Sequence, residues 1–170
     1  LTGEAMPDPT WFTVGWTSAG IQLNVLCFER SMDKIRAHCT MHDQSGLWDD
    51  DCVEVFLNPD PNDTRKSYHY IVNSKGAIWD GRLGFGTETG DAWDGTAKAS
   101  TSIEAKRWRV TLTIPFADLG IAVPTPGQAI KANVYRTRWV GGSLESSAWS
   151  PTNVPDYSIS KRYGTFILGG

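Results

Sequence analysis

Residues 47 to 59, Leu-Trp-Asp-Asp-Asp-Cys-Val-Glu-Val-Phe-Leu-Asn-Pro, decide the fold of this 170-residue chain. Apolar side chains at every second position from 53 to 57 alternate with Cys52, Glu54 and Phe56. This period of two is typical of a strand in a packed sheet. The three aspartates before it are therefore expected at the strand's entrance.

Trp48 and Glu54 indicate what this strand could present to a ligand. A ring at a strand's entrance is poorly placed to join the core, and Glu54 falls on the face opposite the valines, so both can reach one concave surface. Aromatic rings stack on the C–H faces of sugars, while carboxylates accept hydrogen bonds from hydroxyls. We expect a sugar site here. The alternative is that Trp48 covers a sheet edge and the acids form a solvated turn.

Length and composition narrow the class of protein. The chain fits one domain over residues 1–170, in which the polar residues 1–10 are a lead-in. A formal net charge of −3, mixed in sign along the chain, excludes a basic track for nucleic acid. No apolar run approaches the ~20 residues that span a bilayer. Eight Trp and seventeen Gly are typical of secreted binding domains. We therefore expect a monomeric domain that is cut from a longer multidomain protein. Its expected location is extracellular, at the cell surface or in the periplasm.

Short segments of strand character recur along the chain, and none has the 3.6-residue period of a long helix. They predict an all-β antiparallel β-sandwich of about ten short strands, with a flattened barrel as the alternative. One helical turn is expected at 116–120 and long loops at 58–66 and 81–96. The expected strands cover 11–16, 21–29, 35–41, 52–57, 68–73, 77–80, 97–104, 108–114 and 130–139, a short strand that ends at Trp149, and 163–168.

The three cysteines, Cys27, Cys39 and Cys52, show no C-x-x-C spacing and all lie in strand-like apolar surroundings. They are expected to be buried reduced thiols. One disulfide stays open as an alternative, since its geometry cannot be derived from spacing.

Catalytic motifs are absent from the sequence. It contains no G-x-S-x-G, no H-E-x-x-H and no phosphate-cradling glycine loop. A glycosidase would need an acid and base pair, for example Glu54 with Asp51 or Asp80, at a defined separation. We expect a domain that is not an enzyme.

An ordered set of segments resembles family-9 carbohydrate-binding modules, within the wider set of DOMON-like β-sandwiches. The resemblance runs from about Thr13 to Leu168. It is carried by residues 48–57, 68–73 with Gly76, 108–116 with Leu119 and Gly120, 133–136, 148–151 and 163–166.

The resemblance implies a sugar held between two rings. Trp48 would be the first ring and Tyr157 the second, with Glu54 and Asn153 as hydrogen-bonding partners. Tyr157 replaces a Trp of well-known members.

Four further positions bear on this site. Ile71 and Tyr135 stand where well-known members have Arg and Gln, which argues against a preference for glucose or a cellulose reducing end. Asp51 is a further expected ligand-binding residue. Arg136 either supplies a replacement cation or forms a structural pair.

The resemblance also implies a structural calcium ion at loops away from the sugar. Asp60, Asp63 and Asp80 supply hard oxygen ligands for it, although without the spacing of an EF-hand. The alternative is turn-forming Asp, whose side chains bond nearby backbone N–H groups.

By this resemblance the domain would be a non-catalytic module that tethers a polysaccharide-degrading parent enzyme, such as a glycoside hydrolase, to its poly- or oligosaccharide. Two alternatives stay open. One is a structural domain without glycan binding. The other is a haem-binding DOMON-type electron-transfer domain with axial Met and His ligands.

Overall fold

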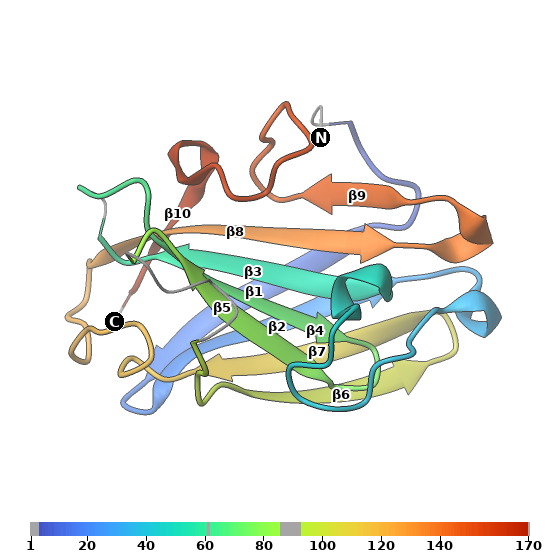
Figure 1. The fold of residues 1–170 in the computed structure, drawn as a ribbon, viewed down its shortest axis with the longest axis horizontal. Coiled ribbons are helices and arrows are strands. Elements are labelled where there is room, and N and C mark those ends of the chain that lie inside the picture. Colours follow the sequence, from blue (N-terminus) through green and yellow to red (C-terminus); the bar gives the residue numbers. More distant parts are fainter. Residues whose placement is uncertain (1–3, 61, 86–92, 170) are drawn as a thin grey trace.

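The opening stretch forms β3 (Cys52–Asn58), an inner strand of the larger of two antiparallel sheets that pack face to face (Figure 1). The structure is a computed structural model and describes residues 4–60, 62–85 and 93–169. The smaller sheet has the order β1-β2-β7-β6, and the larger has the order β10-β8-β3-β4-β5, with β9 added beside β8. The other strands are β1 Thr10–Thr17, β2 Gly20–Phe28, β4 Ser67–Asn73, β5 Ile78–Leu83, β6 Lys98–Glu104, β7 Arg107–Ile114, β8 Ala129–Arg138, β9 Glu145–Ala148 and β10 Gly164–Ile167.

The all-β class predicted from the sequence is confirmed: there are ten strands, and the described residues contain no helix of seven or more residues. Short 3-10 turns connect the strands instead, at η1 (Met32–Lys34), η2 (Leu47–Asp49), η4 (Val140–Gly142) and η5 (Ser160–Arg162). No described helix is long and apolar enough to cross a membrane.

The core lies between the two sheets. Alternate residues of β2 and β7 pack against the inward-facing Val53, Val55 and Leu57 of β3, and together they form one buried cluster. Each such aliphatic side chain contributes ~1.5–3 kcal/mol on burial. The period of two that predicted β3 therefore arises because one face of each sheet is the inside of the sandwich.

The strand predicted over residues 35–41 is wrong. Its backbone N–H groups have carboxylate partners instead of a neighbouring strand: that of Arg36 donates to Asp51 (2.7 Å), and that of Cys39 donates to Asp50 (2.9 Å). Alternating apolar residues there imitate a strand, but the segment forms no ladder. At 116–120 the chain forms a hydrogen-bonded turn rather than a helical one. The loop expected over 81–96 lies partly outside the described residues, and β5 extends into it as far as Leu83.

The three cysteines are free and buried, in agreement with the expected reduced thiols. Cys27 lies in the main core, and burial raises the pKa of its thiol to about 12. Cys39 and Cys52 share a second, smaller buried cluster with Leu47, and Trp79 of β5 packs against this cluster.

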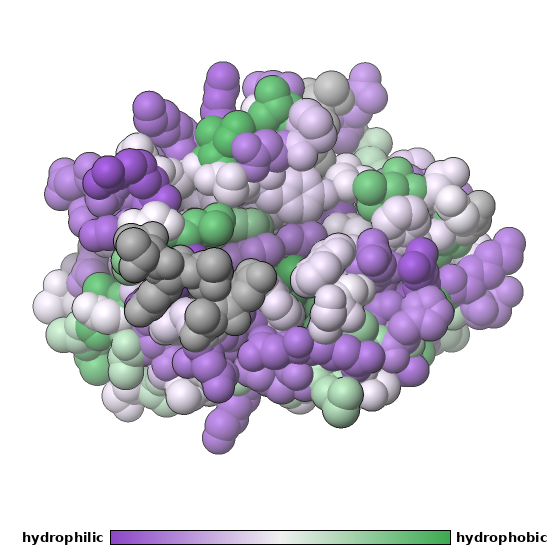
Figure 2. Space-filling view, viewed as in Figure 1, coloured by the Kyte–Doolittle hydropathy of each residue, from purple (hydrophilic) through white to green (hydrophobic). Residues whose placement is uncertain are grey.

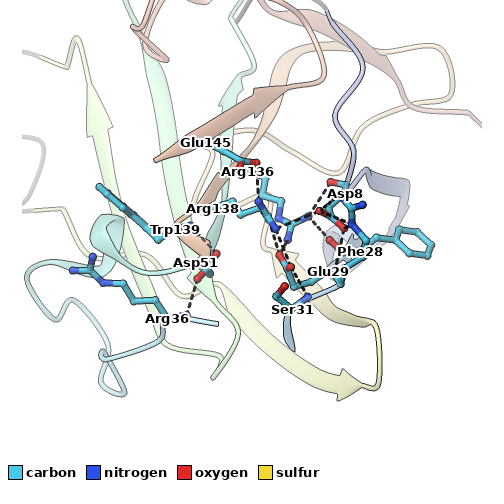
Figure 3. A network of polar contacts seen from close by, with 11 residues as sticks. Asp8, Phe28, Glu29, Ser31, Arg36, Asp51, Arg136, Arg138, Trp139 and Glu145 are labelled. Carbon is cyan, nitrogen blue, oxygen red and sulfur yellow. Dashed lines mark hydrogen bonds and ion pairs between the residues drawn. The ribbon is translucent and has the colours of Figure 1, made fainter. Parts of the chain in front are cut away.

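A buried network of charges joins the two sheets at one end (Figure 3). Glu29, directly after β2, accepts hydrogen bonds from Arg138 (2.6 and 2.9 Å) and from Arg136 (3.2 Å), both on β8. Asp8 of the lead-in lies 3.3 Å from Arg138 and is also paired with Arg30. Glu145 lies 2.8 Å from Arg138 as the third acid, so three carboxylates face three guanidinium groups and the buried charges are compensated.

Candidate functional site

A cleft of about 380 Å³ opens beside the outer face of the six-stranded sheet. It lies between η2, the end of β8, β9 and the loop that follows β9. A volume of this size is at the lower end of the range for small-ligand pockets. The residues that line it are Trp48, Asp49, Thr137, Trp139, Leu144, Ser146, Pro155 and Tyr157.

Trp48 is 46% exposed and stands on η2, outside the core. The short turn begins after Gly46, whose φ of 88° favours glycine, and Leu47 anchors it by complete burial. The Trp48 ring meets Trp79 edge to face, with centroids 6.3 Å apart and an interplanar angle of 89°. The indole is therefore supported from the sheet and still accessible to a ligand.

Tyr157 lies in the same cleft as Trp48. Its ring stacks on Tyr135 of β8, with centroids 4.1 Å apart and planes within 7°. The hydroxyls of Tyr135 and Tyr163 donate to its backbone carbonyl, at 2.9 and 3.1 Å. Burial raises the pKa of the Tyr157 hydroxyl, although hydrogen bonding with Ser146 opposes this. Tyr135 covers one face of the ring, and the partly exposed Tyr157 side chain lines the cleft.

Glu54 lies beneath the cleft rather than on its wall. It is buried, and its two oxygens are held by His69 Nε2 (2.9 Å) and by the Thr137 hydroxyl (3.0 Å). His69 in turn stacks on Phe56, with centroids 3.9 Å apart. Because Thr137 lines the cleft, Glu54 orients a polar group of the cleft wall.

Three other expected ligand residues are not brought to this cleft. Asp51 is fully buried, where it accepts hydrogen bonds from the backbone N–H groups of Arg36 (2.7 Å) and Trp139 (3.0 Å), and burial raises its pKa. Arg136 is buried in the charge network of Figure 3, which matches the structural pair that the sequence left open. Asn153 is exposed at φ 60° in the loop after β9, and it does not line the cleft.

Sequence reasoning missed most of the remaining wall, above all Trp139 and Leu144. Trp139 comes directly after β8 and continues the every-second-residue spacing of Tyr135 and Thr137 on the outer face of that strand, and this was a usable signal. The Arg36 guanidinium lies 5.1 Å from the centroid of the Trp139 ring, within reach of a cation–π contact. The carboxylate on the wall is Asp49, not Asp51.

A second cavity, of about 340 Å³, lies between the lead-in residues 4–10 and β9. Arg136 and Tyr135 reach its wall, but neither Trp48 nor Tyr157 does. From the side shown in Figure 1, the surface is largely hydrophilic and its hydrophobic residues are scattered (Figure 2). This side therefore carries a cleft with aromatic walls rather than a broad apolar patch.

The expected calcium ligands do not form one group in the described part of the chain. Asp63 is paired with Arg65 and Lys66, and hydrogen bonding with Arg65 lowers its pKa to about 2. Asp60 accepts a hydrogen bond from the backbone N–H of Asn62, as a turn-forming Asp does. Asp80 lies elsewhere, on β5. A structural calcium ion, with Asp60, Asp63 and Asp80 as its expected ligands, stays a prediction.

Comparison with known proteins bears on the fold. No protein-family model matches the sequence, and no curated protein matches it. Among solved structures, a protein from Bacteroides uniformis that is provisionally described as carbohydrate-binding has a TM-score of 0.78 and 20% identity, over 95% of this chain and 78% of that one. A family-9 carbohydrate-binding module from Caldicellulosiruptor kristjanssonii, in complex with cellotriose, has a TM-score of 0.74 and 15% identity, over 99% and 78% of the two chains. The chain shares the fold of family-9 carbohydrate-binding modules.

A further structure of a module of this family from Caldicellulosiruptor kristjanssonii, in complex with glucose, has a TM-score of 0.73 and 15% identity, over 99% of this chain and 80% of that one. The family-9 resemblance inferred from the sequence is thus confirmed at the level of the fold. The likeness covers 95–99% of this chain, so it extends over nearly the whole sandwich.

Proposed function

We propose that this domain binds carbohydrate, with a sugar ring held in the cleft between Trp48 and Tyr157. One observation carries the proposal: two aromatic rings far apart in the sequence line the same cleft, one accessible and the other supported on a second tyrosine. Such rings offer flat apolar faces to the C–H groups of a sugar. The structural neighbours solved with cellotriose and with glucose support the same ligand class.

Polar groups between the rings suit the hydroxyls of a sugar. Thr137 and Ser146 provide hydroxyls on the wall, and Asp49 provides an exposed carboxylate. A few hydrogen bonds and one or two stacked rings in a solvated cleft correspond to dissociation constants on the order of micromolar to millimolar. The identity of the sugar is left open by this proposal, because Ile71 and Tyr135 depart from the expected pattern of glucose-binding relatives.

The proposed role is non-catalytic. Both oxygens of Glu54 are occupied by His69 and Thr137, and Asp51 is buried with two backbone partners, so neither is poised as an acid or base toward the cleft. In this proposal the domain is part of a secreted enzyme that degrades polysaccharide. By binding the polysaccharide, the domain would raise the local concentration of substrate at that enzyme. This benefit requires the domain only to bind and to be tethered.

Affinity electrophoresis over a panel of soluble glucans, xylans and mannans, followed by calorimetry with the best ligand, tests the site. We expect Trp48→Ala and Tyr157→Ala each to weaken binding at least ~10-fold, because stacking and apolar contact are lost. Trp11→Ala is the matched control: this indole is 62% exposed on the outer face of the other sheet and is absent from the cleft. Its removal should leave affinity within twofold.

Two results would overturn the proposed site. Binding that survives both Trp48→Ala and Tyr157→Ala would place the ligand elsewhere on the domain. Absence of binding to every glycan, with the wild-type protein folded by circular dichroism, would favour a structural domain.

A further inference from the structure

One imidazole and three carboxylates converge at a second place, where the loop before η2 meets β5. His42 Nε2 lies 3.3 Å from Asp80 Oδ2, and His42 Nδ1 lies 3.2 Å from Asp43 Oδ2 and 4.0 Å from Asp94 Oδ1. Ligand atoms of His42, Asp80 and Asp94 all lie within 4.8 Å of one another. None of these four residues lines the cleft.

Asp80 provides an independent indication that something is bound there. Its side chain is completely buried, and within the described residues its Oδ2 atom has no hydrogen-bond partner. The other oxygen accepts a hydrogen bond from the backbone N–H of Gly95 at 2.8 Å. A buried carboxylate oxygen without a donor is unfavourable, so buried polar atoms of this kind are normally satisfied by protein, water or an ion.

Asp43 orients the imidazole. One of its oxygens accepts a hydrogen bond from the backbone N–H of Asp80 (3.2 Å), and the other faces His42 Nδ1. In the tautomer that carries its proton on Nδ1, beside Asp43, the nitrogen with the free lone pair is Nε2, which lies 3.3 Å from the orphan oxygen of Asp80. Two electron-rich atoms 3.3 Å apart favour a cation between them. A carboxylate that holds the remote N–H of a metal-binding histidine is a recurrent arrangement.

We propose that His42, Asp80 and Asp94 bind one divalent transition-metal ion of the Zn²⁺ class, with Asp43 holding the imidazole. Zn²⁺ takes imidazole nitrogen and carboxylate oxygen at about 2.0–2.2 Å, which places neighbouring ligand atoms about 3–3.6 Å apart. Ca²⁺ prefers six to eight oxygen ligands, and a nitrogen at this position disfavours it. Asp80, which the sequence assigned to calcium with Asp60 and Asp63, therefore belongs in this proposal to a different ion.

The bound ion would link the loop that precedes Trp48 to β5 and to the segment that follows β5. His42 and Asp43 lie a few residues before η2, and Asp94 follows the segment after β5. The backbone N–H of Asp43 already donates to Ile78 O at 2.9 Å. A metal that bridges these segments binds the folded chain and not the unfolded one, so it raises the unfolding temperature.

Isothermal titration of the chelator-stripped protein with ZnCl₂, and visible absorption with Co²⁺, test the site. We expect one ion per chain, an unfolding temperature raised by a few degrees, and at least ~10-fold weaker binding in His42→Ala and in Asp94→Asn. Both side chains are substantially exposed, at 43% and 78%, so the variants should fold. His38→Ala is the matched control, because this imidazole is 73% exposed and pairs with Asp50 instead. It should bind Zn²⁺ as the wild type does.

Three results would overturn the inference. One is the absence of Zn²⁺ and Co²⁺ binding in the stripped wild-type protein. Another is equal binding by the His42→Ala and His38→Ala variants, which would show an adventitious ion only. The last is tighter binding of Ca²⁺ than of Zn²⁺ with no loss in His42→Ala. Glycan binding is measured in separate experiments on other residues, so failure of either proposal leaves the other standing.

Discussion

Asp50 replaces a strand partner for the segment before β3. One of its oxygens accepts the backbone N–H of His38 at 2.7 Å, and the other accepts that of Cys39 at 2.9 Å and the Asn73 amide at 2.9 Å. Burial by itself would raise the pKa of Asp50, but these donors outweigh it and lower the pKa. The ionised carboxylate is therefore part of the folded structure.

Asp50→Asn should lower the free energy of unfolding by about 3 kcal/mol, because charge-assisted hydrogen bonds to buried donors are lost and an amide N–H₂ is placed among donors. Guanidinium titration measures the change. The adjacent Asp49→Asn is the control, since Asp49 is exposed and should change stability by less than about 0.5 kcal/mol. Equal effects of the two substitutions would show that Asp50 does not hold the loop.

The three neighbouring aspartates show what sequence can and cannot predict at this scale. Their position at the entrance of β3 was predicted correctly. Their roles differ, however: Asp49 lines the cleft, whereas Asp50 and Asp51 are buried acceptors. The partners of the buried pair come from residues more than ten positions away, and no local pattern specifies such contacts.

At the scale of elements, alternation predicts a strand only where another strand is there to pair with it. β3 and β7 have a buried face and neighbours on both sides, and both were predicted. Residues 35–41 have a similar alternation, but carboxylates take up their N–H groups. The charge network of Figure 3 was also missed, because Glu29 and its arginines are more than a hundred residues apart.

Glu29→Gln tests whether this network joins β2 to β8. We expect a loss of about 3–5 kcal/mol, since removal of the charge leaves Arg136 and Arg138 buried without their main partner. Glu104→Gln is the control: its partners Arg107 and Arg109 are partly exposed, and such pairs contribute at most about 1 kcal/mol. The two variants are compared by their denaturant midpoints, provided that the free energy of unfolding has the same slope against denaturant concentration in both. A loss for Glu29→Gln no larger than for the control would contradict the structural role.

At the scale of the whole molecule, the core and the cleft lie on opposite sides of the six-stranded sheet. The inner faces of both sheets form the core, and the cleft lies beside the outer face of the six-stranded sheet. The fold class and the two rings could be predicted, because strand period and an ordered family resemblance carry them. Trp139 was predictable from its spacing after Tyr135 and Thr137, whereas Leu144 was not, since its place on the wall depends on the pairing of β8 with β9 and on the loop between them.

The response of the whole domain to acid follows from three buried carboxylates that lie at different places. These carboxylates are Asp8, Glu29 and Asp50. Burial by itself would raise the pKa of each, but hydrogen-bond donors outweigh burial and lower each pKa. The main donors are Arg30 for Asp8, Arg138 for Glu29 and the backbone N–H of His38 for Asp50. A carboxyl whose pKa is lower when folded stabilises the fold fully above its unfolded pKa, near 4. That stability is lost as the pH falls through the folded pKa.

We therefore expect the guanidinium midpoint to be nearly constant from pH 7 to about pH 5 and to fall progressively below pH 4. Asp51 and Asp80, whose pKa values burial raises, have the opposite effect: protonation removes a buried charge, so the decrease in stability is smaller but is not reversed. Asp50→Asn removes one of the three carboxylates whose pKa is lowered by folding. The guanidinium midpoint of this variant should therefore be lower than that of the wild type at pH 7 and should decline less between pH 5 and pH 3. A wild-type midpoint that rises on acidification, or a variant that declines as steeply as the wild type, would show that these carboxylates do not control the acid stability of the sandwich.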